Sequence, residues 1–238
     1  MELLPPSLES DGNFPTLNQD AILSIMRQLP LVSALRLCLV NRDFASASKA
    51  RQMEADILEL PYSDRLSDEV FVHLLAQSPA LKAVHIGGCD MLSSDVALAA
   101  LSTVRTLEVL DLSRTSIDAA CFALLWCSLP HLHVLDVDDC EFLDSRELDR
   151  YLANPHDRCA GRVHTLSLAS CSRLSIHTVS LLCRSCGNWL TSLDASGYDE
   201  LCADDLLPIA VACPSLRASP AVERSVPLPR PQRVDTLA

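Results

Sequence analysis

The amino-acid sequence predicts an α/β solenoid in which short parallel strands line a concave face and helices cover the convex face. A leucine-rich phrase recurs between residues 81 and 213 at a nearly constant interval. Hydrophobic residues make up 49% of the chain and aromatic residues only 4%, which suits thin stacked layers better than a core filled by large rings. Capping residues and an apolar run follow most copies of the phrase, which is the order of a strand, a turn and a helix.

The repeated phrase is Leu-x-x-Leu-x-Leu-x-x-Cys, with conservative replacements. Its five copies begin at Leu81, Leu107, Leu132, Val163 and Leu190, which are 26, 25, 31 and 27 residues apart. A partial copy fits upstream, with Leu58, Leu60, Ser63 and Leu66 in register, and Leu216 begins a further copy. A period of this length carrying this phrase is typical of a leucine-rich repeat solenoid. We therefore expect about six repeats over residues 53–217.

The outer helices have recognisable starts. Helix-capping residues occur once per repeat, at Ser67, Ser94, Asp118, Asp144-Ser145, Ser175 and Asp204-Asp205. Apolar residues such as Val70, Leu74 and Leu75 then supply the buried face. The longest repeat carries about five additional residues at 154–161, which we interpret as an enlarged loop at the edge of the solenoid. A substrate-contacting loop is the alternative interpretation of this insertion.

The residue between the second and third leucine positions is expected to face outward, because side chains alternate along a strand. In successive repeats this position forms a row across the concave face: Glu59, His85, Asp111, Asp136, Ser167 and Asp194. Asp138 and Asp139 lie beside the row. The acidic row predicts a groove for a basic peptide, with Glu59, His85, Asp111, Asp136, Asp138 and Asp194 as the substrate-binding candidates. A solvated acidic surface without a ligand is the alternative.

The chain before the repeats has a different character. Residues 1–13 contain little that can pack, whereas residues 14–52 show apolar residues at helical spacing in three short stretches. Three helices in about 40 residues bury too little surface to be stable alone. This region therefore needs a partner, which is either the solenoid or another protein.

The run from Leu17 through Ile22, Ile25 and Leu29 to Pro30 resembles the opening of an F-box, and the run from Leu35 through Val40 to Phe44 resembles its continuation. Asn18, Met26 and Phe44 stand where the family usually has Pro, Phe and Trp. An F-box followed by cysteine-containing leucine-rich repeats is the arrangement of the F-box/leucine-rich-repeat family, and the resemblance covers roughly residues 14–217.

The resemblance implies a substrate-recognition subunit of an SCF-type E3 ubiquitin ligase. The F-box would bind a Skp-type adaptor, and through it a cullin, by residues matching the motif: Leu17, Ile22, Ile25, Leu29, Pro30, Val40 and Phe44. The repeats would then bind the protein substrate. The alternative is a scaffold or assembly factor in which the F-box-like segment only caps the first repeat, because the end layer of a solenoid needs covering.

Composition narrows the functional classes. The net charge of −12 argues against nucleic acid and anionic membranes as partners. The N-terminus lacks the pattern of a secretory or transit signal, so we expect a cytoplasmic or nuclear location. The eleven cysteines are then expected to be reduced thiols in small apolar sites. Residues 218–238 are rich in proline and are expected to form an extended tail.

The sequence shows no pattern typical of an enzyme or of a cofactor site. It lacks a nucleophile elbow and a phosphate-binding glycine loop. The pair Cys183 and Cys186 is a single Cys-x-x-Cys, whereas a structural zinc site usually needs four ligands, so we interpret both as core thiols. We expect a non-catalytic protein with no cofactor and no metal.

Overall fold

The computed structural model describes residues 19–29, 42–63, 66–152, 162–198 and 203–217. The expected second helix of the N-terminal region, the 154–161 loop and both terminal segments lie outside these residues. The chain divides into two compact units between Arg51 and Gln52.

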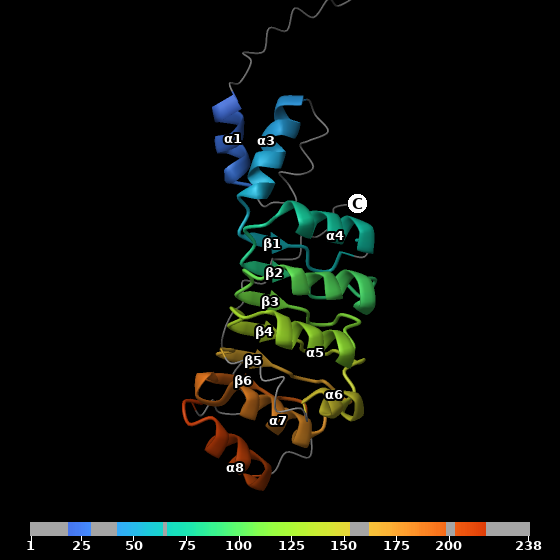
Figure 1. The fold of residues 1–238 in the computed structure, drawn as a ribbon, viewed down its shortest axis with the longest axis vertical. Coiled ribbons are helices and arrows are strands. Elements are labelled where there is room, and N and C mark those ends of the chain that lie inside the picture. Colours follow the sequence, from blue (N-terminus) through green and yellow to red (C-terminus); the bar gives the residue numbers. More distant parts are fainter. Residues whose placement is uncertain (1–18, 30–41, 64–65, 153–161, 199–202, 218–238) are drawn as a thin grey trace, which may run out of the picture. The chain divides into compact units, whose positions relative to one another are not determined.

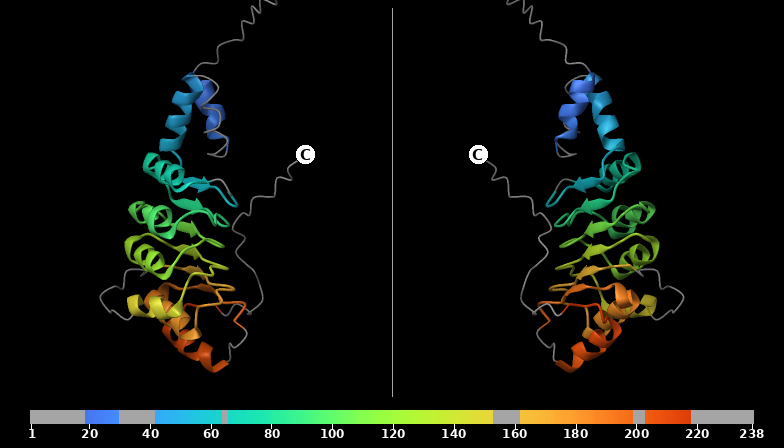
Figure 2. Two further views of the ribbon diagram at one scale, coloured as in Figure 1. Left: turned by 90° about the vertical axis from the view of Figure 1, so that its right-hand side faces the viewer. Right: turned by 90° about the vertical axis from the view of Figure 1, so that its left-hand side faces the viewer.

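The first unit contains α1 (Gln19–Arg27) and all but the last two residues of α3 (Arg42–Met53), which are two of the three expected helices. They run side by side in both figures (Figures 1 and 2). On α1, Ile22 is buried whereas Ile25 has 45% of its surface exposed. The helix thus has one packed side and one apolar side chain open to solvent.

The second unit is a solenoid with strands on one face and helices on the other (Figures 1 and 2). Its six strands pair in parallel, in sequence order. They are β1 (Ile57–Glu59), β2 (Ala83–His85), β3 (Val109–Asp111), β4 (Val134–Asp136), β5 (Thr165–Ser167) and β6 (Ser192–Asp194). The predicted fold class is confirmed, including the upstream repeat around Leu58.

The outer layer consists of helices and shorter helical turns: α4 (Asp68–Gln77), η2 (Ser94–Leu98), η3 (Leu101–Thr103), α5 (Ala119–Ser128), α6 (Ser145–Leu152), α7 (Ile176–Cys186), η4 (Gly187–Trp189) and α8 (Ala203–Ala212). Ser67, Asp118 and Ser175 cap their helices as predicted. No helix in the described part of the chain is long and apolar enough to cross a membrane.

Two details of the outer layer differ from the expectation. In the second repeat Ser93, not Ser94, is the capping residue, and the chain forms the π-helical segment η2 and the 3₁₀ turn η3 in place of one α-helix. Asp68 holds Ser93 by accepting hydrogen bonds from its backbone N–H and its hydroxyl. On α4, Leu75 is buried as predicted, but Leu74 is half-buried, Val70 is exposed, and Phe71 fills the core instead.

The core is a stack of aliphatic layers. The central residue of each strand lies opposite the central residue of the next: Leu58, Val84, Leu110, Leu135, Leu166 and Leu193. The first five are buried, and Leu193 in the last strand is half-buried. Each layer therefore covers the one before it, which is how a solenoid builds a continuous core from short strands.

Every repeat turns with one residue in the left-handed backbone region. Its φ angle is +55° at Tyr62 and +77° at Gly88, and the equivalent residues are Arg114, Asp139, Ser170 and Gly197. The backbone N–H of this residue donates to a carbonyl oxygen of the next repeat, as from Arg114 to Asp138 at 2.8 Å. The hydrogen-bonded ladder thus extends beyond the strands. Glycine, which has no Cβ, adopts this conformation without strain but occupies only two of these positions.

The cysteines that end the repeated phrase are buried, but they are more than the small apolar groups predicted. The thiols of Cys89, Cys140 and Cys171 each donate to a carbonyl oxygen of the preceding repeat, at 3.0 to 3.2 Å. The Tyr198 hydroxyl, at the same position in the fifth copy, donates to Leu168 at 3.1 Å. Burial raises the pKa of Cys171 to about 11, which keeps its thiol protonated as a donor at neutral pH. These residues join consecutive layers.

A pair of substitutions at Cys171 separates hydrogen bonding from apolar packing. We expect Cys171→Val to lower the free energy of unfolding by about 1 to 2 kcal/mol, because the Val137 carbonyl oxygen loses this donor. Cys171→Ser keeps a donor and is expected to be the milder change. Urea unfolding of the two variants measures the difference. If the serine variant is the less stable of the two, apolar packing is the more important role of Cys171.

Candidate protein-binding surface

The predicted row on the strand face exists. Glu59, His85, Asp111, Asp136, Ser167 and Asp194 lie opposite one another in consecutive register across the six strands. Neighbouring parallel strands are about 4.8 Å apart, so the carboxylates of Asp111 and Asp136 are close neighbours. Asp138 lies outside the row, just beyond the end of β4. The role of these residues in binding a substrate stays a prediction.

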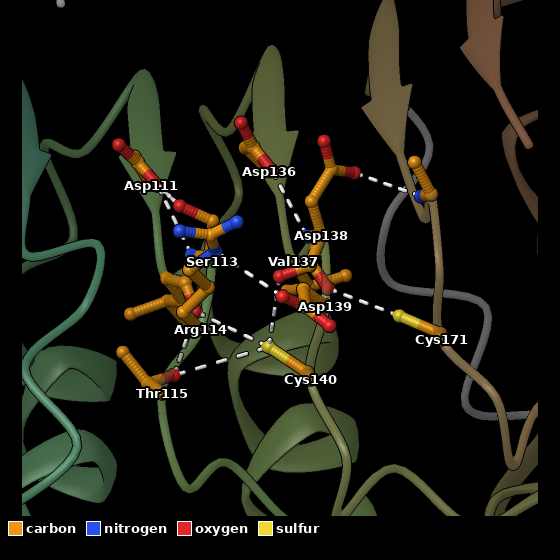
Figure 3. Close-up of polar contacts among 12 residues, drawn as sticks. Asp111, Ser113, Arg114, Thr115, Asp136, Val137, Asp138, Asp139, Cys140 and Cys171 are labelled. Carbon is orange, nitrogen blue, oxygen red and sulfur yellow. Dashed lines mark hydrogen bonds and ion pairs between the residues drawn. The ribbon is translucent and has the colours of Figure 1, made fainter. Parts of the chain in front are cut away.

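Asp111 is held by groups on both sides, of which Figure 3 shows Ser113. Its Oδ1 accepts hydrogen bonds from the Ser113 hydroxyl at 2.8 Å and from the Ser113 backbone N–H at 3.0 Å, and its Oδ2 lies 3.8 Å from Nδ1 of His85. Burial by itself would raise the pKa of Asp111, but His85 and Ser113 together lower it below the usual value. Asp111 is therefore ionised at neutral pH.

Gly87 makes room for this arrangement. A Cβ at this position would lie 2.6 Å from the Ser113 hydroxyl oxygen and 3.0 Å from Oδ1 of Asp111. Gly88 is the residue of the pair that has a positive φ. Gly87 thus leaves space for the Asp111–Ser113 contact, whereas Gly88 allows the left-handed backbone of the turn. The sequence alone indicates only a turn.

The acidic residues of the row have a structural role that the sequence pattern did not indicate. Asp136 accepts from the backbone N–H of Asp138 at 3.0 Å, and Asp194 accepts from that of Ser196 at 2.9 Å. Together with the Asp111–Ser113 contact, these bonds close the same two-residue turn after three strands. Such turns are a common use of aspartate, so part of the acidic pattern is explained by folding alone.

Asp138 supplies the same contact to the next repeat. Ser167 stands where β3, β4 and β6 have aspartate. The turn that follows it is capped by Oδ1 of Asp138, which accepts from the Ala169 backbone N–H at 2.8 Å and from the Ser167 hydroxyl at 2.6 Å. Burial raises the pKa of Asp138, the two hydrogen bonds oppose this, and the charges of Asp194 and Asp111 raise it further. The net result is a pKa above the usual aspartate value.

Arg114 brings one positive charge to this acidic region. Its Nε lies 3.2 Å from Oδ2 of Asp139, and both side chains are about half exposed. An exposed ion pair of this kind contributes little stability. Figure 3 shows both side chains lying beyond the strand ends. The strand face therefore combines a fixed acidic row with a more loosely held pair beside it.

The arrangement of these side chains does not form a nucleophilic relay. A relay would need the imidazole of His85 to accept the proton of the Ser113 hydroxyl. Ser113 instead donates to Asp111, and His85 also faces Asp111. Among the described residues, no group of three or more His, Cys, Asp or Glu side chains is placed to hold a metal ion. Cys183 and Cys186 are buried in the core, in agreement with their interpretation as core thiols.

The structure describes only part of the predicted adaptor-binding set. Leu17, Pro30 and Val40 lie outside the described residues, and the side chain of Phe44 is also outside them. Leu29, half-buried, follows the end of α1. Ile25 is exposed and Ile22 is buried, which separates a residue open to a partner from one that packs internally.

No family model matches the chain, and no curated protein matches it. Among solved structures, it is similar to a chain in the crystal structure of the Rad7 and Elc1 complex in yeast, with 14% identity and a TM-score of 0.54. That match covers 88% of this chain and 63% of the other, so the present chain spans less than two thirds of that relative's length.

A second similar structure is the leucine-rich repeat-containing protein LegL7 from Legionella pneumophila. It is 18% identical, with a TM-score of 0.52, and the match covers 84% of this chain and 68% of that chain. At these identities the likeness concerns the fold alone. Together with the six-stranded parallel sheet and its outer helices, it shows that the chain has the fold of an α/β leucine-rich repeat solenoid.

Proposed function

We propose that the protein is a non-catalytic substrate-recognition subunit of an SCF-type E3 ubiquitin ligase, acting in the cytoplasm or nucleus. The F-box-like segment binds a Skp-type adaptor, and through it a cullin, while the strand face of the solenoid binds a protein substrate. The observation that carries this proposal is the order of the chain, in which a short helical unit with an F-box-like sequence directly precedes a leucine-rich repeat solenoid.

The first unit supports the adaptor part of the proposal. Its size is too small for independent stability, so it needs a partner. Ile25 on α1 presents an apolar side chain to solvent while Ile22 packs, and exposed apolar groups on a small helical unit favour a docking role. A yeast chain of similar fold was crystallised in a complex of Rad7 and Elc1, so this fold is compatible with stable association.

The strand face supports the substrate part. Asp111 and Asp136 lie on neighbouring strands in a fixed register, and Asp111 is ionised at neutral pH. Hydrogen bonds to the turns hold these carboxylates in place before any ligand arrives, and a preorganised surface loses less entropy on binding. The charge pattern is complementary to a substrate segment rich in Lys and Arg.

Co-purification with a Skp-type adaptor tests the proposal. The wild-type chain is expected to bind the adaptor, and Leu29→Asp combined with Pro30→Ala is expected to abolish binding, because a charge would be buried in an apolar contact. Gln28→Asp is the matched control, since Gln28 is exposed and adjacent. It adds the same charge and is expected to leave binding intact.

Two results contradict the adaptor role: a folded wild-type chain that does not bind, or a double variant that binds like the wild type. Circular dichroism of each protein establishes that the solenoid is folded. Failure of the folded wild type to bind would favour the alternative, in which the helical segment caps a repeat scaffold and has no adaptor.

A further inference from the structure

The edge at which the strands begin differs in chemistry from the edge at which they end. His133 and His164 occupy the position just before β4 and β5, where the His133 carbonyl oxygen accepts from the backbone N–H of His164 at 2.8 Å. One position before the leucine of each copy, His131, Arg162 and Trp189 follow one another in successive repeats. We call these five residues the His–Trp edge.

Three rings of this edge, those of His133, His164 and Trp189, follow one another in tilted contacts. The His133 and His164 ring centroids are 4.9 Å apart, and those of His164 and Trp189 are 5.8 Å apart. The guanidinium carbon of Arg162 lies 5.9 Å from the centroid of Trp189. A guanidinium that lies over the face of an aromatic ring can still use its N–H groups for hydrogen bonds.

These side chains are open to solvent. Trp189 is 51% exposed, His131 and Arg162 are exposed, and His133 and His164 are half-buried. A large aromatic residue exposed to this degree on a rigid element is a common feature of interaction surfaces. Backbone hydrogen bonds between repeats hold the backbone of both histidines in register.

The five residues of the His–Trp edge include one cation, Arg162, and no carboxylate, whereas the chain as a whole is acidic. The chain carries a net charge of −12, and Asp111, Asp136 and Asp138 lie on or beyond the strand ends. On the strand-start edge Lys82 pairs with Glu108 at 3.2 Å. Within the part of the chain that the structure describes, no carboxylate forms an ion pair with Arg162. Arg162 is exposed to solvent, so its guanidinium can meet a carboxylate from outside.

We propose that the His–Trp edge is a second protein-binding surface, which takes an acidic peptide segment. The carboxylates of that segment bind the Arg162 guanidinium, whose planar fork matches a carboxylate in a bidentate contact. The imidazole N–H groups of His131, His133 and His164 supply further donors, and Trp189 supplies a flat apolar surface for a neighbouring side chain. Arg162 is the one permanent cation among these five residues, whereas nucleic-acid binding is supported by several phosphate contacts, which disfavours a polynucleotide as the ligand.

Fluorescence of Trp189 tests this inference, because the other tryptophan, Trp126, is buried. In a Trp126→Phe variant of the full chain, a short oligoglutamate peptide is expected to change the emission of Trp189 saturably. An oligolysine of the same length is expected to have no effect. Arg162→Glu is expected to weaken oligoglutamate binding about tenfold or more, the size of one charge-assisted hydrogen bond.

Arg173→Glu is the matched control, since Arg173 is an exposed arginine after the end of β5, and it is expected to leave binding within about twofold, as a distant surface charge does. If Trp126→Phe fails to fold, the wild-type chain is titrated instead, with Trp189→Phe as the reference that retains only the emission of the buried Trp126. The inference is overturned by no saturable response to oligoglutamate, by equal responses to both peptides, or by unchanged binding in Arg162→Glu. Tighter binding of a short oligothymidylate would assign the edge to nucleic acid instead. None of these outcomes bears on adaptor binding.

Discussion

Leu110→Ala is expected to lower the free energy of unfolding by about 3 to 5 kcal/mol, the range for emptying a well-packed leucine site. Leu110 is completely buried and lies between Val84 and Leu135 of the neighbouring strands. A solenoid is stabilised by contacts between adjacent repeats. The cavity would therefore weaken the interfaces on both sides of β3.

The matched control is Val109→Ala on the same strand. Val109 is half-buried, and removing its two methyl groups is expected to cost about 1 kcal/mol. Urea unfolding of both variants, followed by circular dichroism, measures the difference. Similar losses in the two variants would show that the aliphatic stack at β3 contributes less than its burial indicates.

Asp138→Ala is expected to lower the free energy of unfolding by about 2 to 3 kcal/mol. The change removes the acceptor for the Ala169 backbone N–H and the Ser167 hydroxyl, leaving two partly buried donors unpaired. Asp138→Asn keeps an oxygen acceptor at the same place and is expected to be neutral or slightly stabilising at pH 7. Urea unfolding at pH 7 compares the two variants. Equal losses in both would mean that the charge of Asp138, and not its acceptor, joins the two repeats.

The raised pKa of Asp138 gives this comparison a pH dependence. A carboxyl group whose pKa is raised by folding binds more protons in the folded state, so its contribution to stability falls as pH rises. The fall begins near the unfolded value of about 3.9 and is complete above the raised folded value. The free-energy difference between Asp138→Asn and wild type is therefore expected to shift in favour of the variant as pH rises through this window. A difference that does not change from pH 3 to pH 7 would contradict the raised pKa.

The periodic parts of the structure could be predicted from the sequence. The leucine positions fix which residues are buried, and the two-residue alternation of a strand then fixes the outward row, so Glu59 and Asp194 were aligned correctly although they lie at opposite ends of the sheet. The same pattern predicted the upstream repeat at Leu58. Periodicity is informative here because every repeat meets identical neighbours.

The hydrogen bonds between repeats were not predictable in the same way. The contact of Asp138 with Ala169 joins residues in different repeats and depends on the serine at position 167. The hydrogen bond of the Cys171 thiol forms because the Val137 carbonyl of the preceding repeat points toward it, and the sequence does not indicate that direction. The sequence contains one signal for the left-handed turn, since Gly88 and Gly197 occupy equivalent positions. The other four repeats have a residue other than glycine there, so the pattern is not recognisable from the sequence.

The left-handed turns bear on how the number of repeats can change. Each repeat forms hydrogen bonds with its neighbour through equivalent backbone donors and acceptors, both within the strand and in the turn after it. Excising residues 107–131, one full period, would place Leu132 where Leu107 stands and offer the preceding repeat an equivalent set of partners. The strand face can therefore grow or shrink by whole layers of about 4.8 Å, by duplication or loss within the gene, while the contacts between repeats stay the same.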